Sequence, residues 1–237
     1  MGNGSNALVQ GVNGQLVDHV EDDRPADGEL VIISPLAASL PWELGEIACA
    51  LPVGDANGTL LEALNGERPR SGVFAGMLVH DPFRRTDDLL DALCERGVAG
   101  VVNWPSVGAL DGETASALAH SGFRYADELA FLQQASSRGL HTAVRIHDIG
   151  QLEAALEIRP SGLIVAPGAQ AAPGSDPNAL PDGMAAVLDA VDTLGDVQAW
   201  AYLPGNTNDV DRLLPPSVGV IRHAGPPSRA DDPAPAY

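Results

Sequence analysis

The sequence contains no lysine, because all 13 of its basic residues are arginines. Without an ε-amino group the chain cannot form a Schiff base with a carbonyl substrate, cannot use pyridoxal chemistry and has no Walker lysine. We therefore expect an anionic substrate to be held by arginine side chains or by backbone N–H groups.

Basic and aromatic residues are both scarce. Against 32 acidic residues the 13 arginines leave a formal net charge of −19, which argues against a nucleic-acid or anionic-membrane partner. We interpret the acidic surface as a means of solubility, with an acidic functional face as the alternative. Aromatic residues make up only 4% of the chain and hydrophobic residues 45%, so aliphatic side chains must fill the core.

Cysteines and long apolar runs are scarce too. Cys49 and Cys94 make no disulfide framework and no paired-cysteine motif, so we expect two buried free thiols in a reducing compartment. The first residues lack the basic and apolar regions of a signal peptide, and no apolar run reaches the length of a membrane span. These features predict a cytoplasmic protein.

Short runs rich in valine and isoleucine alternate with helix-period segments along the chain. The alternation predicts parallel strands joined by crossover helices, and eight strand–helix units predict a single-domain α/β fold, a (β/α)8 TIM barrel, over residues 1–224. A doubly wound open sheet is the alternative. The expected strands are 7–9, 30–33, 73–79, 98–102, 142–146, 162–165, 197–202 and 218–221, and the clearest helices are 86–96, 125–137, 150–158 and 184–194.

Two segments rich in proline are predicted to be irregular. Residues 225–237 are expected to form a disordered tail, and residues 168–181, after the sixth strand, are expected to form an active-site loop or lid.

Charges gather where the third strand is expected to end, in His80-Asp-Pro-Phe-Arg84. In a barrel the catalytic residues lie at these strand ends. Asp81 could act as a general base or orient His80, and the fork of Arg84 could hold a carboxylate or phosphate. Alternatively, Asp81 begins a turn with Pro82 and Arg84 lies in the solvated first turn of a helix.

Other strand ends carry further candidates. Asn103 could polarise a carbonyl or tie its own loop, and the backbone of Gly108 could offer an N–H group to an anion. Glu128 either complements a helix dipole or moves a proton. The remaining candidates for substrate binding are Asn13, Ser34 and His147. Although His147 and His223 both end strands, no metal-ligand spacing supports a metal site, and we predict neither a metal nor another cofactor.

Four ordered motifs resemble the phosphoenolpyruvate hydrolase-like TIM-barrel family. They are Leu51-Pro-Val-Gly-Asp-Ala-Asn57, His80-Asp-Pro-Phe-Arg84, Asn103-Trp-Pro-Ser-Val-Gly108 and Gly122-Phe-Arg-Tyr-Ala-Asp-Glu128, within a resemblance that covers roughly residues 7–170. The resemblance implies a barrel fold and hydrolase or lyase chemistry on a small oxo acid or enol phosphate. By position it places Asp55, Asn57, Asp81, Arg84, Asn103 and Glu128 in the family pattern.

Two or three of the eight strand-end loops depart from that family, and Val9-Gln-Gly-Val-Asn-Gly14 is only a partial echo of its first, Gly-rich loop. The second reads Ser34-Pro-Leu-Ala-Ala-Ser39, without the usual Asn and Arg, and the loop after the sixth lacks the usual His. Two functions follow. The first is a metal-independent enzyme that cleaves a C–C or C–O bond of a small anionic carbonyl substrate, with Arg84 holding the acid, Asn103 stabilising an oxyanion and Asp81 or Glu128 moving the proton. The second is a catalytically degraded barrel that binds an effector or an identical or paralogous barrel subunit.

Overall fold

Eight parallel strands close into a barrel in the order of the sequence, from β1 to β8. The structure is a computed structural model that describes residues 13–18, 29–50, 54–65, 72–169, 179–181, 183–203 and 210–223, without the side chains of residues 42, 43 and 223. β1 pairs with both β2 and β8, which closes the ring. The predicted (β/α)8 TIM barrel is confirmed. The strands are β1 (Gly14–Val17), β2 (Leu30–Ile33), β3 (Val73–Met77), β4 (Gly100–Asn103), β5 (His141–Ile146), β6 (Gly162–Val165), β7 (Gln198–Leu203) and β8 (Val218–His223).

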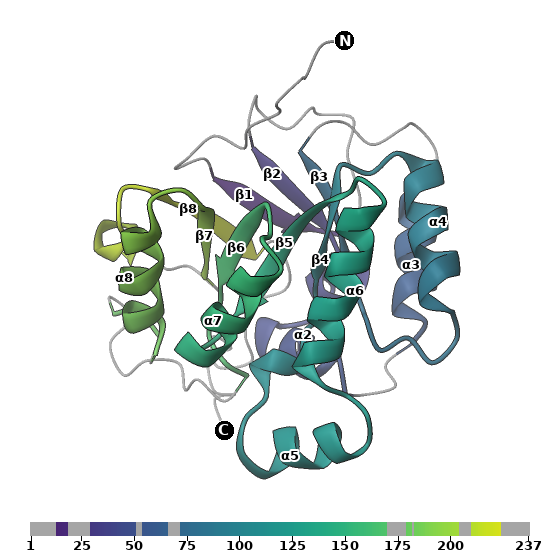
Figure 1. Ribbon diagram of the computed structural model, residues 1–237, viewed down its shortest axis with the longest axis horizontal. Helices are drawn as coiled ribbons and strands as arrows, with labels where there is room; N and C mark the ends of the chain where they lie inside the picture. Colours follow the sequence, from purple (N-terminus) through teal and green to yellow (C-terminus); the bar gives the residue numbers. More distant parts are fainter. Residues whose placement is uncertain are drawn as a thin grey trace, which may run out of the picture.

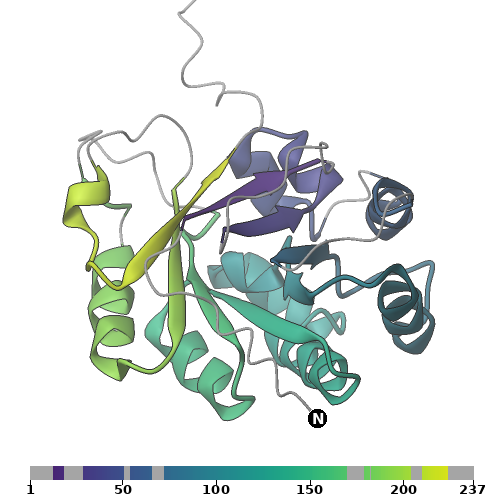
Figure 2. The ribbon, with the colours of Figure 1, turned by 90° about the horizontal axis from the view of Figure 1, so that it is seen from above.

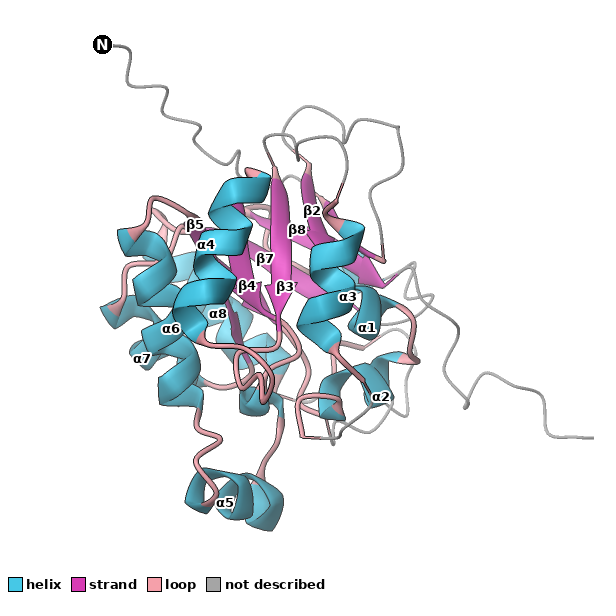
Figure 3. Cartoon of the chain, turned by 90° about the vertical axis from the view of Figure 1, so that its right-hand side faces the viewer, coloured by secondary structure: helices cyan, strands magenta, loops and turns pink. Residues whose placement is uncertain are grey.

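The helices divide between the side of the barrel and one of its ends. Most of them surround the strands (Figures 1 and 2), whereas α2 and α5 lie at the end toward which the strands point (Figure 3). The helices in the described part are α1 (Pro35–Ala38), α2 (Trp42–Ile47), α3 (Ala56–Ala63), α4 (Thr86–Arg96), α5 (Gly112–His120), α6 (Tyr125–Ser137), α7 (Ile149–Glu157) and α8 (Met184–Leu194), with short 3-10 turns at Val107–Ala109 and Val210–Leu213.

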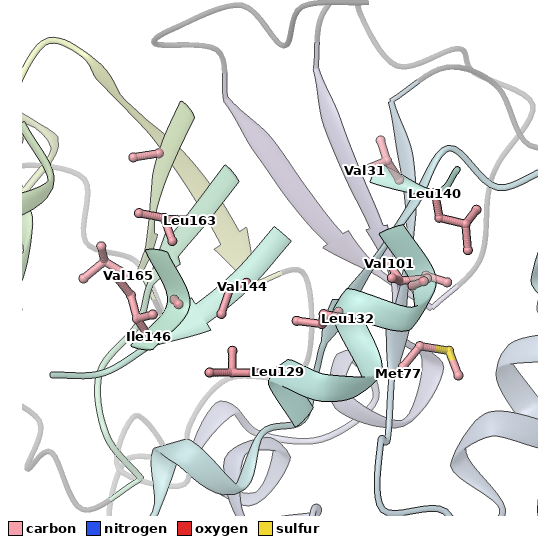
Figure 4. Packing of buried hydrophobic residues seen from close by; sticks show 14 of the residues in the cluster. Val31, Met77, Val101, Leu129, Leu132, Leu140, Val144, Ile146, Leu163 and Val165 are labelled. Atoms are coloured by element: carbon pink, nitrogen blue, oxygen red, sulfur yellow. The ribbon is translucent and has the colours of Figure 1, made fainter. Parts of the chain in front are cut away.

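Most strands bury both of their faces, which explains the continuous apolar runs in the sequence. Side chains that point outward meet the helices in one large core, part of which Figure 4 shows between α6 and strands β4 to β6. Side chains that point inward fill the barrel itself. In β7, for example, Ala199 and Ala201 belong to the outer core, whereas Trp200 and Tyr202 belong to the inner one. This alternation decides which strand residues can reach the mouth of the barrel.

Most of the expected elements are confirmed. Helices α4, α6 and α8 have the bounds that the apolar spacing predicts, and Leu89, Leu90 and Leu93 are buried on α4 as expected. A left-handed Gly97 ends α4 at φ 69°, a conformation that favours glycine. Residues 225–237 and most of the expected lid, 168–181, lie outside the described residues.

The predicted place of the first strand is wrong. The apolar run at 7–9 lies outside the described residues, and β1 is instead formed by Gly14–Val17, whose alternating buried and half-buried residues give a weaker apolar signal. Asn13 therefore precedes β1 rather than following it. Its side chain accepts a hydrogen bond from the backbone N–H of Val220, 3.2 Å away. This places Asn13 at the amino end of the barrel, away from the strand ends where we expected it to bind substrate.

The expectation for the cysteines is half right. Cys49 is buried, but Cys94 is exposed on α4, because the buried stripe of that helix is formed by its leucines. None of the helices in the described part of the chain has the length and apolarity needed to cross a membrane.

Candidate functional site

A buried arginine stands at the carboxyl end of the barrel. In β5, Val144 and Ile146 point outward into the large core, so the alternating Arg145 points inward. Its side chain is completely buried, with 0% exposure. A cationic side chain in such a place is rare unless it has a partner, and it marks this end of the barrel as the place to look for function.

The partner of Arg145 comes from α2. Glu46 on this helix places Oε1 2.6 Å from Nη2 of Arg145, and the Glu46 side chain is 1% exposed. Figures 1 and 3 show α2 at the end of the barrel to which the strands point. Glu46 thus reaches the mouth of the barrel from a helix that lies over it. Burial raises the pKa of the Glu46 carboxyl, and the nearby Arg145 only partly opposes that rise.

Two aromatic rings hold the guanidinium of Arg145. Its Cζ lies 4.0 Å from the centroid of the Trp104 ring and 5.6 Å from that of Tyr202. The two rings meet edge to face, with centroids 4.7 Å apart. A desolvated cation over an aromatic face is stabilised by about 2 kcal/mol, so the rings compensate part of the cost of burying the charge.

Several polar atoms of this centre have no hydrogen-bond partner among the described residues. They are Nε and Nη1 of Arg145, Oε2 of Glu46 and Nε2 of His147, and all are shielded from solvent. Buried polar atoms in folded proteins are nearly always satisfied by protein, water or ligand. Nε and Nη1 of Arg145 are hydrogen-bond donors. Oε2 of Glu46 and Nε2 of His147 can each accept a hydrogen bond or a proton. We refer to Arg145, Glu46 and His147 as the arginine centre.

His147 is held as a neutral base. Its Nδ1 lies 3.1 Å from the carbonyl oxygen of Ala166 and 2.9 Å from that of Pro167. Because both partners are acceptors, Nδ1 carries the hydrogen and Nε2 carries the lone pair. Burial, reinforced by the charge of Arg145, lowers the pKa of His147 to about 3. The imidazole therefore stays neutral and presents Nε2 as an acceptor.

Glu128 and Asn103 meet, as parts of one buried network. Oε2 of Glu128 accepts hydrogen bonds from Asn103 Nδ2 at 2.8 Å and from Ser106 Oγ at 2.6 Å, while Oε1 accepts from the N–H of Val107 at 2.8 Å. Asn103 Oδ1 accepts from the backbone N–H of Arg145 at 2.9 Å. Burial raises the pKa of Glu128 to about 7, although the three hydrogen bonds oppose the rise. The network fixes the segment that carries Trp104 beside Arg145.

Gly108 and Ser34 also form hydrogen bonds that hold the segment carrying Trp104. The N–H of Gly108 donates to Ser106 Oγ at 3.1 Å, and the carbonyl of Gly108 accepts from Gln151 Nε2 at 2.8 Å. A Cβ at Gly108 would lie 2.7 Å from the ring of Tyr125, so this close approach requires glycine. Ser34 Oγ donates to the carbonyl of Trp104 at 3.3 Å. In this structure both polar groups bind protein rather than facing open space.

Arg84 and Asp81 belong to a second cluster, between α3 and the loop after β3. Both terminal nitrogens of Arg84 reach Asp55, with Nη1–Oδ1 at 2.5 Å and Nη2–Oδ2 at 2.7 Å. Asp55 also caps α3 by accepting from the N–H of Gly58 at 2.8 Å. This pairing holds the pKa of the Asp55 carboxyl below its usual range. The fork of Arg84 is thus occupied by a carboxylate of its own chain.

Asp81 is similarly occupied. It accepts hydrogen bonds from the N–H of Phe83 at 2.6 Å and of Arg84 at 3.2 Å, and from Asn57 Nδ2 at 2.8 Å. Asn57 also exchanges two hydrogen bonds with the backbone of Leu78. This is the turn that we weighed as the alternative to a catalytic Asp81. The roles of Asp81 and Arg84 in catalysis remain predictions.

His80 makes its contacts outside these two clusters. Its ring lies tilted by 46° against that of Phe123, with centroids 5.1 Å apart, and Nε2 is 3.3 Å from the carbonyl oxygen of Arg124. Burial lowers the pKa of His80.

Of the nine candidates named from the sequence, the structure joins Asn103 with Glu128 and Asp81 with Arg84. His147 alone among them contributes an atom to the arginine centre, and the other two members of that centre were missed.

A surface pocket of about 520 Å³ opens beside α1 and α3, and its lining includes Asp18, Asp55 and Glu62. In the described part of the chain, the residues that line it include three acidic side chains and no basic one, which disfavours an anionic ligand. Among the described residues, no three His, Cys, Asp or Glu side chains gather as metal ligands.

Burial raises the pKa of Cys49 to about 12, which leaves its thiol a poor nucleophile.

The family model of phosphoenolpyruvate hydrolase-like proteins matches residues 26–161, more than half of the chain. The chain belongs to the phosphoenolpyruvate hydrolase-like family. The match includes α2 with Glu46, the loop after β3 and β5 with Arg145. It thus covers both the Arg84 cluster and the arginine centre.

The chain is also similar to parts of three curated proteins. An uncharacterized protein of Sinorhizobium fredii, y4oT, is 42% identical over 117 residues, which are 49% of this chain and 60% of that protein. The ToMV resistance protein Tm-1 and the ToMV susceptible protein tm-1 of Solanum lycopersicum are each 39% identical over 101 residues, which are 41% of this chain and 13% of each tomato protein. The chain therefore matches less than two thirds of the length of any of these relatives.

Proposed function

We propose that the chain is an enzyme that binds a small carboxylate-bearing substrate at Arg145 and cleaves a C–C or C–O bond in it. The observation that carries the proposal is the buried guanidinium of Arg145, whose Nε and Nη1 have no hydrogen-bond partner among the described residues. Leaving a buried donor unpaired costs about 1–3 kcal/mol. Oxygen atoms of a bound oxo acid or enol that accept from these nitrogens would remove that cost.

The proposal moves the acid-binding role from Arg84 to Arg145. Both terminal nitrogens of Arg84 are occupied by Asp55, whereas Arg145 makes a single contact with Glu46. The low dielectric around a fully buried guanidinium also strengthens its attraction for an oxyanion, compared with a guanidinium in water. Arg145 can therefore bind the acid group and also stabilise an enolate that develops as a bond breaks.

His147 supplies the acceptor. Its Nε2 can accept a hydrogen bond from a substrate hydroxyl or from a water molecule. The charge of Arg145 is one of the causes that lower the pKa of His147. A substrate carboxylate bound at Arg145 would add a negative charge that opposes this effect, so the pKa of His147 would rise and the imidazole would become a better base. Substrate binding thus prepares the proton acceptor for bond cleavage.

A second candidate is a barrel that binds a partner protein instead of turning over a substrate. It is favoured by Glu46, which already fills one side of Arg145 and leaves both side chains at most 1% exposed. Large apolar side chains are also exposed after the carboxyl ends of three strands, namely Leu44 at 43%, Phe83 at 69% and Ile149 at 40%. Such side chains around one end of a barrel suit a protein contact.

Ligand binding and turnover separate the two candidates. Thermal unfolding would be measured with pyruvate, oxaloacetate, phosphoenolpyruvate and acetylpyruvate, using wild type, Arg145→Lys, Arg145→Met and the matched control Arg84→Met. A ligand at 100 times its Kd adds about 2.7 kcal/mol to stability. We expect a shift in wild type and Arg84→Met that is lost in Arg145→Met, followed by product formation seen by NMR. If Arg84→Met instead abolishes the shift, the acid is bound elsewhere. No shift with any compound would favour the partner-binding barrel.

A further inference from the structure

We infer that the arginine centre takes up one proton with each carboxylate that it binds, and that Glu46 carries this proton as the general acid of the site. The inference rests on the proposed function, because it requires an acid bound at Arg145. It adds a catalytic role for a residue on α2, the helix over the mouth of the barrel.

The charge balance of the site carries the inference. Arg145 and Glu46 are in contact at 2.6 Å, and their side chains are 0% and 1% exposed. One positive and one negative charge cancel there. A second carboxylate bound at Arg145 would leave a net negative charge among buried side chains, which is strongly disfavoured. The site regains neutrality when one of its groups accepts a proton from solvent.

The other titratable groups around this pair are poorly placed to take that proton. Burial raises the pKa of Glu128 on α6 to about 7, but its carboxylate is bonded to Asn103, Ser106 and the N–H of Val107 instead of to Arg145, and protonation would weaken those hydrogen bonds. Burial raises the pKa of Tyr125 on α6 and of Cys49 after α2, so both are already protonated. His147 after β5 has a pKa of about 3, chiefly because of burial, which a bound ligand would not remove.

Glu46 has the geometry of a proton carrier. Oε1 faces Arg145, whereas Oε2 is buried without a hydrogen-bond partner among the described residues. Burial is also the largest influence on this carboxyl, and it raises the pKa. A proton on Oε2 lets Glu46 donate a hydrogen bond while Oε1 still accepts from Arg145.

The binding step is balanced in atoms and charge. A ligand carboxylate, a proton from solvent and the ionised Glu46 give a complex that contains the ligand carboxylate, the guanidinium and a neutral Glu46 carboxylic acid. In turnover, the Glu46 O–H bond breaks and its proton passes to the enolate or alkoxide oxygen released by bond cleavage. His147 Nε2 accepts the proton of the substrate hydroxyl or attacking water in the same cycle.

The test is calorimetric titration of the full chain with pyruvate and with acetate. Titrations in phosphate and in Tris at one pH give the number of protons taken up, because the two buffers differ in heat of ionisation. In wild type we expect about one proton for each ligand and an affinity that falls about tenfold for each pH unit above the pKa of Glu46. In Glu46→Gln we expect binding without proton uptake and with little pH dependence. Glu113→Gln, at an exposed position on α5, should behave as wild type.

The outcomes are distinguishable. Binding that needs Arg145 but takes up no proton overturns the inference and leaves the proposed function standing, and so does uptake that persists in Glu46→Gln. No binding of either acid to wild type overturns the proposed function and the inference together. If Glu46→Gln does not fold, the infrared difference spectrum of wild type decides. A carboxylic acid C=O band that develops when pyruvate binds supports the inference, and its absence contradicts it.

Discussion

Two arginine–carboxylate pairs flank the carboxyl ends of the strands, and they differ in nearly every physical respect. Arg84 and Asp55 make two contacts, at 2.5 and 2.7 Å, with side chains that are 28% and 45% exposed. Arg145 and Glu46 make a single contact at 2.6 Å and are almost completely buried. In the exposed pair both carboxylate oxygens accept from the guanidinium, whereas the buried pair has two donor nitrogens and one carboxylate oxygen without a hydrogen-bond partner in the described part of the chain.

A well-formed ion pair near a strand end is therefore not by itself a binding site. A pair that satisfies itself in solvent contributes about 0–1 kcal/mol and mainly fixes the loops that it joins. A buried pair with unsatisfied atoms is costly to maintain, and a ligand can lower that cost. Four measurements would test this contrast.

The largest effect is expected from Arg145→Met. Removing one member of a buried ion pair leaves the other uncompensated and typically costs about 3–5 kcal/mol. We expect this loss at pH 8 by urea denaturation, and a smaller one at acidic pH, where Glu46 can protonate. The double variant Glu46→Gln with Arg145→Met should recover part of the loss. If Arg145→Met costs no more than Arg84→Met, the contrast between the pairs is wrong.

The second effect concerns Glu128, which anchors the segment beside the buried pair. Its pKa is raised from 4.5 to about 7, so the folded chain binds this proton more tightly than the unfolded chain does. The stability that Glu128 contributes is full below pH 4.5 and is lost as pH rises through 7, by about 3 kcal/mol in total. Carboxyl NMR should show a group titrating near neutral pH, which is missing in Glu128→Gln. The stability of that variant should vary less between pH 4.5 and 7. A Glu128 midpoint near 4.5 would contradict this.

The third effect has the opposite sign and tests the neutral state of His147. Its pKa falls from 6.5 to about 3, so the unfolded chain binds this proton more tightly. Stability is full above pH 6.5 and falls as the solution is acidified, by about 2 kcal/mol at pH 5. His147→Asn should lose this dependence, whereas His120→Asn, at an exposed position on α5, should keep it. NMR that shows His147 protonated at pH 6 would contradict the burial argument.

The sequence predicted the scaffold better than the centre within it. Strand–helix alternation and the leucine stripe of α4 were sufficient for the barrel, because both depend on local periodicity. Asp55 and Arg84 were identified through the family motifs, but their pairing with each other was not predicted. Arg145 carried a signal that was overlooked, namely a charged residue inside the apolar run 142–146. Such a residue must either break the strand or find a partner inside the barrel.

Glu46 offered no comparable signal. It stands in a short helix of ordinary composition, and its partner lies 99 positions away in the sequence. Only the closure of the barrel brings α2 over β5, so periodicity and strand-end rules cannot pair these two residues. The sequence also left the roles of Asn103 and Glu128 open, because each side chain can form hydrogen bonds either with a loop or with a ligand. The hydrogen bonds of the folded chain were needed to show which groups each of them contacts.

The smallest effect is expected at the exposed pair, and it completes the contrast. Arg84→Ala should cost at most about 1 kcal/mol, because both side chains are partly solvated. Asp55→Ala should cost about 1 kcal/mol more than Asp55→Asn, because asparagine keeps the α3 cap to Gly58 whereas alanine loses it. Urea denaturation of the three variants measures both differences. None of the three should alter pyruvate binding. A loss of binding in Arg84→Ala with unchanged stability would return the acid-binding role to Arg84, because it would mean that a substrate displaces Asp55 rather than occupying the arginine centre.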